Sequence, residues 1–300
     1  MRPDLLVCPA CRAVGDGRID LRTLERAGDD LVCECGGRFP IVDGVASFAM
    51  THEVETAAAS PGSRSAAEPR AATIDDATRE HISIYMDAHW ARPLPFAAKL
   101  AGLARVHRAV ELGCSAGRIV HELAQTADHV VGVDLAFATL RRARRLLDGL
   151  PADYERRVVG NHYEPARAEP PRAVTNVTLV QADALDPPLV PRAYDRVVAL
   201  NLIDSVRDPL QLLEVCDALC APGGELIVSS PYAWQAGITD PAAWLGGADP
   251  AAALVDHLRP GYAIADEDEL AWTLRRDARC QVTYRVHYLR ARKAGPLPAV

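Results

Sequence analysis

Acidic residues stand at the ends of three apolar runs in the middle of the chain. Glu111 lies in the first run, Asp134 ends the second and Asp183 follows the third. Asp134 comes 21 residues after Gly113. At this spacing, a carboxylate on the second strand of a doubly wound sheet accepts hydrogen bonds from ribose hydroxyls. The spacing therefore indicates a ligand that contains an adenosine-type nucleoside.

The residues after Glu111 predict how that ligand is held. Gly113 and Gly117 permit close approach of the backbone, and a helical period begins at Arg118. A helix N-terminus that faces a glycine-lined crevice binds an anionic or polar group. The turn lacks the G-x-G-x-x-G pattern of dinucleotide-binding folds. We therefore expect a crevice at this turn for a nucleoside ligand other than a dinucleotide.

Four cysteines near the N-terminus have a spacing suited to a metal. Two pairs lie about twenty residues apart and consist of Cys8, Cys11, Cys33 and Cys35. Thiolates in two tight turns are the ligands of a structural zinc ion, although the second pair has one intervening residue where two are usual. We predict bound zinc; the alternative is four reduced cysteines in a ribbon that has lost its metal.

The composition limits the partners that we expect. The chain has 300 residues, 49% of them hydrophobic and 24% charged, and a formal net charge of −7. This charge weighs against nucleic acid as the main partner, although a local basic patch is compatible with it. No signal peptide or apolar run of about 20 residues is evident, so we expect a cytoplasmic protein without a membrane partner. The oligomeric state stays open.

The motifs require alternating strands and helices to position them. We predict the α/β fold class, with a Rossmann-like, seven-stranded, mostly parallel sheet whose last strand, near 281–290, is antiparallel. A small zinc-ribbon domain is expected at 1–50. A linker poor in large apolar residues follows at 51–73, and the main domain at 74–300.

The order of the motifs resembles that of class I S-adenosylmethionine-dependent methyltransferases. The pattern acid-x-Gly-x-x-x-Gly at 111–117, then Asp134 and then Asp183, is similar to the family's first three motifs. Further similarity follows at 194–201 and 222–228. The resemblance implies that the main domain is a class I methyltransferase domain and that S-adenosylmethionine is its cofactor.

The resemblance also implies the roles of individual residues. Glu111 would order the turn or the methionine ammonium group, Asp134 would bind ribose and Asp183 would bind adenine; each acid could instead be a solvated carboxylate or a helix cap. Ser115 stands where many members have glycine. The implied cofactor-binding residues are Glu111, Gly113, Cys114, Gly117, Asp134, Leu135, Asp183, Ala184 and Asn201.

Segments after the fourth and fifth expected strands bear on the methyl acceptor. Asn-Leu-Ile-Asp at 201–204, Ser-Pro-Tyr-Ala-Trp at 230–234 and Trp-Leu-Gly-Gly at 244–247 resemble the methyltransferase domain of ovothiol-biosynthesis proteins. Those proteins methylate an imidazole nitrogen of a mercaptohistidine. The resemblance implies a small-molecule substrate of histidine or thiohistidine type, imidazole-bearing or amino-acid-like, that is methylated on nitrogen.

Candidate residues for handling this substrate follow from these segments. Polar groups that could move a proton are Asp204, Tyr232 and His287. Residues that could bind the substrate are Asn201, Tyr85, Trp234, Trp244, Arg275 and Arg279. For Asp204 the alternative is a helix cap, for His287 a surface position, for the arginines a surface ion pair and for the aromatic residues the core.

Two other functions remain open at this stage. The first fifty residues, with Phe-Pro-Ile-Val-Asp-Gly at 39–44, resemble small zinc ribbons that accompany methyltransferases of ribosomal and transfer RNA. Together with the basic run Arg141–Arg145, they would suit an RNA base methyltransferase, although such a run is usually a solvated face. The other alternative is a non-catalytic scaffold that binds the cofactor.

Overall fold

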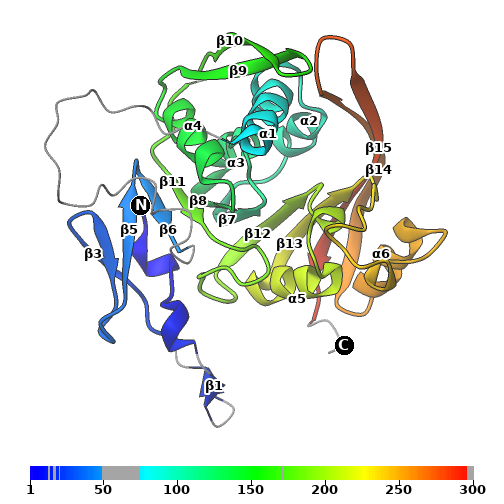
Figure 1. Cartoon of the computed structure of the whole chain (residues 1–300). Helices are drawn as coiled ribbons and strands as arrows, with labels where there is room; N and C mark the ends of the chain where they lie inside the picture. The colour runs from blue at the N-terminus through cyan, green and yellow to red at the C-terminus, as the bar shows by residue number, and fades with distance from the viewer. Residues whose placement is uncertain (13, 16–17, 20, 49–74, 171, 296–300) are drawn as a thin grey trace, which may run out of the picture.

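The structure is a computed structural model that describes residues 1–12, 14–15, 18–19, 21–48, 75–170 and 172–295. A single large mixed sheet forms its centre, with helices on both faces (Figure 1). The expected linker at 51–73 lies outside the described residues. No helix in the described ranges is long and apolar enough to cross a membrane.

Seven strands of the sheet have the arrangement expected from the sequence. Their spatial order is β14 (Tyr262–Arg275), β15 (Gln281–Lys293), β13 (Cys220–Ser230), β12 (Tyr194–Leu200), β7 (Val106–Leu112), β8 (Ala127–Asp134) and β11 (Val177–Gln181). The strands from β13 to β11 pair in parallel, and β15 pairs antiparallel with both of its neighbours. The antiparallel last strand is therefore confirmed.

The sheet continues past β11 and has eleven strands in the described part of the chain. The four additional strands are β6 (Val45–Ser47), β5 (Arg38–Val42), β4 (Asp30–Val32) and β3 (Glu25–Ala27). β6 pairs in parallel with β11, where Ser47 Oγ donates to Gln181 Oε1 at 2.7 Å. The prediction of seven strands was too low, because the N-terminal segment pairs with an edge that would otherwise expose unpaired backbone groups.

Helices cover both faces of the sheet. In Figure 1, α1 (Asp76–Met86), α2 (Pro95–Ala101), α3 (Arg118–Thr126) and α4 (Phe137–Leu147) lie on one side, and α5 (Pro209–Leu219) and α6 (Pro250–Leu258) on the other. β7 is buried between them: Val110 and Leu112 belong to one apolar cluster and Ala109 to another. Burial on both faces explains why the strand reads as a nearly continuous apolar run.

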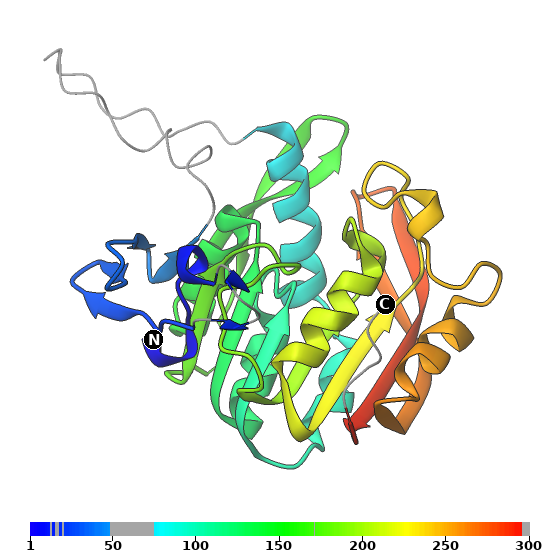
Figure 2. The same cartoon turned by 90° about the horizontal axis from the view of Figure 1, so that it is seen from below.

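Shorter elements complete the described fold. Two hairpins pair β1 with β2 and β9 with β10, and Figure 2 shows the N-terminal strands and α6 at opposite ends of the sheet. The bounds are β1 (Val14–Gly15), β2 (Arg18–Ile19), β9 (Ala152–Val159) and β10 (His162–Ala168). The single turns are η1 (Pro3–Leu5), η2 (Pro9–Cys11), η4 (Ile203–Ser205), η5 (Pro241–Ala243) and the π-helical η3 (Asp87–Ala91).

Candidate active site

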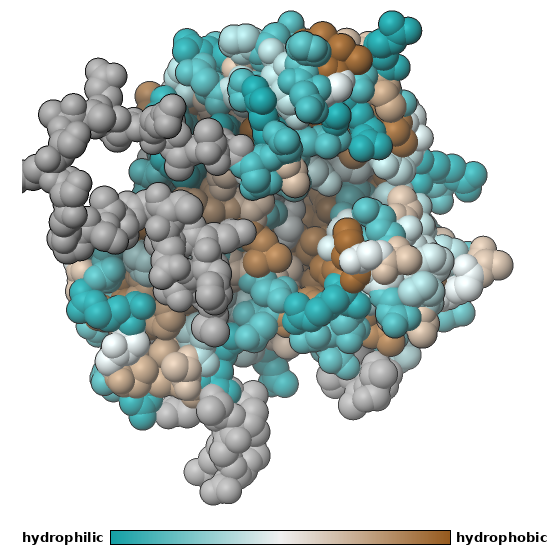
Figure 3. All heavy atoms as spheres, viewed as in Figure 1, coloured by the Kyte–Doolittle hydropathy of each residue, from teal (hydrophilic) through white to brown (hydrophobic). Residues whose placement is uncertain are grey.

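A cavity of about 600 Å³ opens at the carboxyl ends of the central parallel strands. Residues that follow β7, β8, β11 and β12 form one wall, and α1, η3 and β14 form the opposite wall. Figure 3 shows apolar residues gathered around a hollow in this face of the molecule. Ligands of open parallel sheets bind at this edge, because the loops after the strands diverge there.

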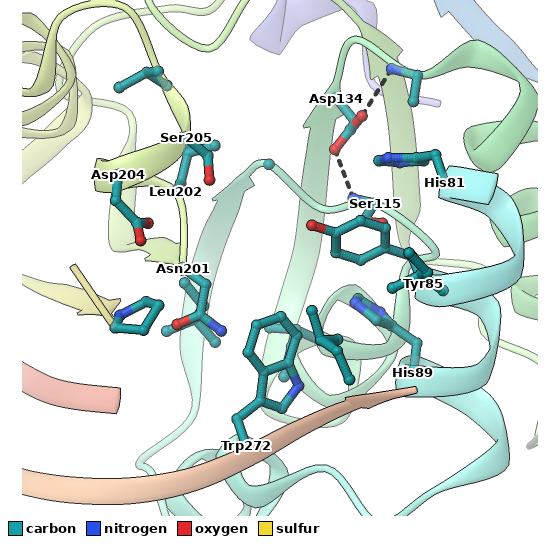
Figure 4. Close-up of a pocket in the computed structure, with 18 of the residues that line it drawn as sticks. His81, Tyr85, His89, Ser115, Asp134, Asn201, Leu202, Asp204, Ser205 and Trp272 are labelled. Atoms are coloured by element: carbon teal, nitrogen blue, oxygen red, sulfur yellow. Dashed lines mark hydrogen bonds between the residues drawn. The ribbon is translucent and has the colours of Figure 1, made fainter. Parts of the chain in front are cut away.

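Asp134 is fixed at the end of β8 by two backbone hydrogen bonds. Its Oδ2 accepts from the Ser115 amide and its Oδ1 from the Ala136 amide, both at 2.8 Å (Figure 4). The carboxylate thereby ties the turn after β7 to the turn after β8. Each carboxylate oxygen still has a lone pair for a ligand hydroxyl.

Glu111 is the most deeply buried acid of the cavity wall. Its side chain is 2% exposed, and its Oε2 has no hydrogen-bond partner within the described structure. Burial raises the pKa of Glu111 well above its usual value, and the charge of Asp134 raises it further. A buried acceptor without a partner is costly, so Glu111 suits a cationic or hydrogen-bond-donating ligand group.

The turn after β7 requires its first glycine. Gly113 has φ +73°, and a Cβ there would lie 2.8 Å from Leu202 Cδ1. Gly117 has φ +78°, but its added Cβ would meet Ala143 of α4 at 2.9 Å. Gly117 therefore permits close packing of two helices and lies outside the cavity lining. Ser115 adopts φ +46° without being glycine.

Three further residues from the expected cofactor set differ in position. Leu135 and Ala184 line the cavity, whereas Cys114 is fully buried behind the turn. The thiol of Cys114 lies 3.0 Å from the position that a Cβ on Gly132 would take. Cys114 therefore packs against β8 and does not line the cavity.

Asp183 also lines the cavity and is held by the chain on both oxygens. Its Oδ1 accepts from the Leu185 amide at 2.8 Å, and its Oδ2 pairs with Arg207 Nη1 at 2.6 Å. Sequence reasoning did not select Arg207, since an arginine 24 residues downstream gives no local signal of this ion pair.

Asn201 and Asp204 approach the cavity from the end of β12. Asn201 has φ +53°, and its Oδ1 accepts from Ser229 Oγ at 3.0 Å. Asp204 is 3% exposed; its Oδ2 accepts from the Ala233 amide at 2.7 Å, while its Oδ1 has no partner among the described residues. Burial raises the pKa of Asp204 above its usual value. An acid of this kind can accept a proton from a ligand.

Tyr232 and His287 form a hydrogen-bonded pair beside the cavity. Tyr232 Oη lies 2.8 Å from His287 Nδ1, and His287 Nε2 lies 3.1 Å from Glu267 Oε1. Both residues lie outside the lining, although Pro231 and Ala233 on either side of Tyr232 belong to it. The pair can act on the cavity only through its neighbours.

Helix α1 and η3 place Ile84 and three ring side chains on the cavity, and the ring side chains are spaced four residues apart. Tyr85 was selected from the sequence, and His81 and His89 were missed. The side chains all point toward the cavity in Figure 4. His81 Nε2 and His89 Nδ1 are buried without a partner in the described part of the chain. The four-residue spacing of ring side chains on one helix was the available signal.

Four of the residues proposed for substrate binding lie outside the lining. Trp234 and Trp244 stack on each other, with ring centroids 6.0 Å apart. Arg275 Nη1 donates to the Arg157 carbonyl at 3.1 Å, and the Arg279 amide donates to Asp277. The cavity is lined instead by Trp272, Leu274, Arg276 and Tyr284. Side chains alternate along a strand, so Trp272 and Leu274 share the face opposite to Arg275.

The four N-terminal cysteines converge at a distance from this cavity. Their Sγ atoms all lie within 4.8 Å of one another, and Cys8 with Cys35 and Cys11 with Cys33 are each 3.7 Å apart. Tetrahedral zinc with Zn–S bonds of about 2.3 Å places its sulfurs about 3.8 Å apart. The donor set and its spacing therefore fit zinc.

The arginine side chains of the basic run on α4 contact other residues of the same chain. Arg141 pairs with Asp43, and Arg144 with Asp148 at 2.6 Å. Arg142 donates to the Ala138 and Asp153 carbonyls, and Arg145 to the Pro151 carbonyl. These contacts join α4 to the β5–β6 turn and to β9, which gives the run a structural role.

Comparisons with known proteins point to one enzyme class. Residues 110–226 match the model of the family described as "Methyltransferase domain". Ubiquinone biosynthesis O-methyltransferases are 27% identical over 125 residues in Marinobacter nauticus and 29% over 139 in Bordetella avium, and these alignments cover 41% and 46% of this chain. The chain spans 43% and 48% of those relatives. The matches support the class expected from the sequence, an S-adenosylmethionine-dependent methyltransferase.

Solved structures of methyltransferases are also similar to the chain. The N-methyltransferase NodS of Bradyrhizobium japonicum, in complex with S-adenosyl-L-homocysteine, is 14% identical. The alignment covers 66% of this chain and 84% of NodS, with a TM-score of 0.43. This similarity is too low to transfer a ligand or a residue role.

Proposed function

We propose that the chain transfers a methyl group from S-adenosylmethionine to a nitrogen of a small, imidazole-bearing or amino-acid-like substrate. The observation that supports it most is a set of acids on one cavity, at the ends of neighbouring strands. Glu111 and Asp134 lie in β7 and β8, Asp183 follows β11, and Asp204 lies in η4 after β12. The first three suit a nucleoside with a cationic group, and the fourth suits an acceptor that loses a proton.

The cavity has features that fit the cofactor. Glu111 offers a buried acceptor without a partner for the methionine ammonium group. Asp134 offers lone pairs for the ribose hydroxyls, and Gly113 lines the cavity beside it. Asp183 stands at the end of the third strand, where the family resemblance expects adenine. When bound, S-adenosylmethionine supplies an electrophilic methyl group on a positively charged sulfur.

The residues of the chain have separate tasks in this proposal. Asp134 and Asp183, held by backbone amides and Arg207, orient the nucleoside. Asp204, through its unpartnered Oδ1, accepts the proton that the methylated ring loses from its other nitrogen. Alignment of the acceptor nitrogen with the methyl carbon accounts for most of the rate gain.

The acceptor is proposed to be nitrogen in an imidazole because of the resemblance to ovothiol-biosynthesis proteins. The curated relatives are named for O-methylation in ubiquinone biosynthesis. However, the matched segment 110–226 contains the acids of the cofactor side and omits Tyr85, His89 and Trp272 of the opposite wall. The matched segment therefore does not include the wall on which we place the methyl acceptor.

Turnover on defined substrates tests the proposal. We expect S-adenosylmethionine-dependent methylation of L-histidine or a thiohistidine, detected by mass spectrometry, and no methylation of bulk RNA. Methylation of RNA alone would identify an RNA base methyltransferase, against which the engaged arginines of α4 weigh. Cofactor binding with no turnover on either substrate would favour the non-catalytic scaffold.

We also propose a structural zinc ion on Cys8, Cys11, Cys33 and Cys35, within a ribbon at 1–50 that precedes a linker at 51–73 and the catalytic domain at 74–300. Reduced cysteines of this kind suit the cytoplasm. Elemental analysis of freshly purified protein should give one zinc per chain. A Cys33→Ser variant should lose zinc and melt at a lower temperature, whereas Cys280→Ser, outside the cluster, should retain it.

A further inference from the structure

The turn between β14 and β15 carries an arginine at the rim of the cavity. Arg276 directly follows β14 and lines the cavity, and its side chain is 56% exposed. The turn lies beside β9 (Figure 1). The Ala278 amide donates to the Val158 carbonyl at 2.9 Å, and Arg275 Nη1 donates to the Arg157 carbonyl at 3.1 Å. These contacts hold Arg276 where the cavity meets the solvent.

The rim around Arg276 has a surplus positive charge. Two arginines share the carboxylate of Glu80 on α1. Glu80 Oε1 lies 2.6 Å from Arg157 Nη1 and 3.2 Å from Arg276 Nη2. Within the described residues, neither arginine pairs with another carboxylate. One negative charge therefore faces two positive charges, and Arg276 is the more distant of the two arginines from the shared oxygen.

Arg276 is also the only lysine or arginine among the described residues that line the cavity. Two histidines line it as well, but burial lowers the pKa of His81 and lowers that of His89 to about 4, so both rings are neutral near pH 7. The other ionisable groups of the lining include four acids. A ligand carboxylate that enters this cavity therefore meets a cation only at Arg276.

We propose that Arg276 binds a carboxylate of the methyl acceptor, so that the substrate is an amino acid rather than an amine. A guanidinium group has five N–H donors in a fork that matches the two oxygens of a carboxylate. In the described structure, Glu80 engages only Nη2 of Arg276. This inference rests on the proposed function, because it names the group by which that substrate is held.

The cofactor has a carboxylate too, next to its ammonium group. In the proposed function that ammonium group pairs with Glu111 of β7. Arg276 lies on the opposite wall, where its contact with Glu80 keeps the guanidinium group beside α1. The position of Arg276 therefore favours the carboxylate of the acceptor over that of the cofactor.

Methyl transfer to a matched amino acid and amine tests the proposal. The full chain is assayed with L-histidine and a thiohistidine, and the methylated compound is compared with the amine that lacks its carboxylate, which is histamine for L-histidine. We expect kcat/KM to be about ten-fold higher for the amino acid, because the amine loses a charge-assisted hydrogen bond. An equal or higher value for the amine would overturn the inference and leave methyl transfer to a small imidazole compound intact. Methylation of none of these compounds would contradict the proposed function itself.

Variants assign the preference to Arg276. Arg276→Gln should lower kcat/KM for the amino acid about ten-fold, chiefly through KM, and should change it for the amine by less than about two-fold. Arg285→Gln, which removes an exposed arginine of β15 that pairs with Glu269 at 2.9 Å, should behave like the parent. An equal loss for the amino acid and the amine would overturn the proposal. So would an Arg276→Gln protein that binds S-adenosyl-L-homocysteine less well but keeps the preference, because Arg276 would then hold the cofactor.

Discussion

The two walls of the cavity are built in different ways. The wall with Glu111, Asp134 and Asp183 comes from the ends of three adjacent parallel strands within one continuous segment. The opposite wall joins α1 and η3 to β14, so that His89 and Trp272, far apart in the chain, lie on one surface. The first wall is set by strand order, whereas the second depends on how a helix and a long hairpin cover the sheet.

The residues of the cavity also differ in how far the chain satisfies their polar groups. Asp134 and Asp183 each use both carboxylate oxygens in hydrogen bonds or an ion pair. Glu111 and Asp204, which stand on the same wall, and His89 and Trp272 on the opposite wall each leave a buried atom without a partner in the described structure. Residues with satisfied groups hold their positions before a ligand arrives, while residues with open groups favour the ligand that completes them. The following predictions test this difference.

Asp204→Asn should have the largest effect, and only on turnover. Loss of the proton acceptor should lower kcat by roughly 10²- to 10⁴-fold, while the affinity for S-adenosyl-L-homocysteine stays the same. Because burial raises the pKa of Asp204, kcat/KM of the parent should fall as pH falls through that raised pKa, and the variant should lack this limb. Initial rates across pH and calorimetry measure both effects. An unchanged kcat would remove Asp204 from the reaction.

The stability of the folded protein should depend on pH through His89. Folding lowers the pKa of His89 from 6.5 to about 4, so the unfolded chain takes up the proton first. The free energy of unfolding should therefore decrease by about 3 kcal/mol as pH falls from 6.5 towards 4. Urea unfolding at several pH values measures it, and His89→Phe should show a correspondingly smaller decrease. The same slope in both proteins would disprove the assignment.

Asp134→Asn should affect the cofactor wall alone. An amide nitrogen cannot accept the hydrogen bonds that the carboxylate accepts, so the affinity for S-adenosyl-L-homocysteine should fall roughly 10- to 100-fold. The rate at saturating cofactor should change much less. Asp153→Asn, at an exposed ion pair with Arg167, is the matched control and should bind like the parent. Unchanged cofactor affinity in Asp134→Asn would contradict the ribose assignment.

Glu111→Gln should have the smallest effect on cofactor affinity, which it lowers, and it should raise the stability of the ligand-free protein at neutral pH. Cofactor affinity should fall about ten-fold, because the ammonium group loses a charged partner. The ligand-free parent should lose stability as pH rises from the ordinary glutamate pKa towards the raised pKa of buried Glu111, whereas the variant has no charge to bury. Its melting temperature at neutral pH should be higher than that of the parent. A lower melting temperature together with unchanged cofactor affinity would contradict this account.

Local patterns in the sequence were sufficient for the features that depend on neighbouring residues. The strands, the glycine turn and the acids that follow them were predicted because each strand brings its own end residues to the same edge of a parallel sheet. The cysteine pairs were equally local, since two turns bring their thiols together. These patterns supported the enzyme class and the candidate cofactor side of the cavity.

Only the tertiary structure decided the features that depend on long-range packing. It placed the N-terminal strands on the edge of the main sheet, used the arginines of α4 in internal contacts, and brought His89 to Trp272. It also turned Trp234, Trp244 and Arg275 away from the cavity. Periodicity indicates which side chains share a face of one element, but which other element covers that face depends on packing across the whole chain.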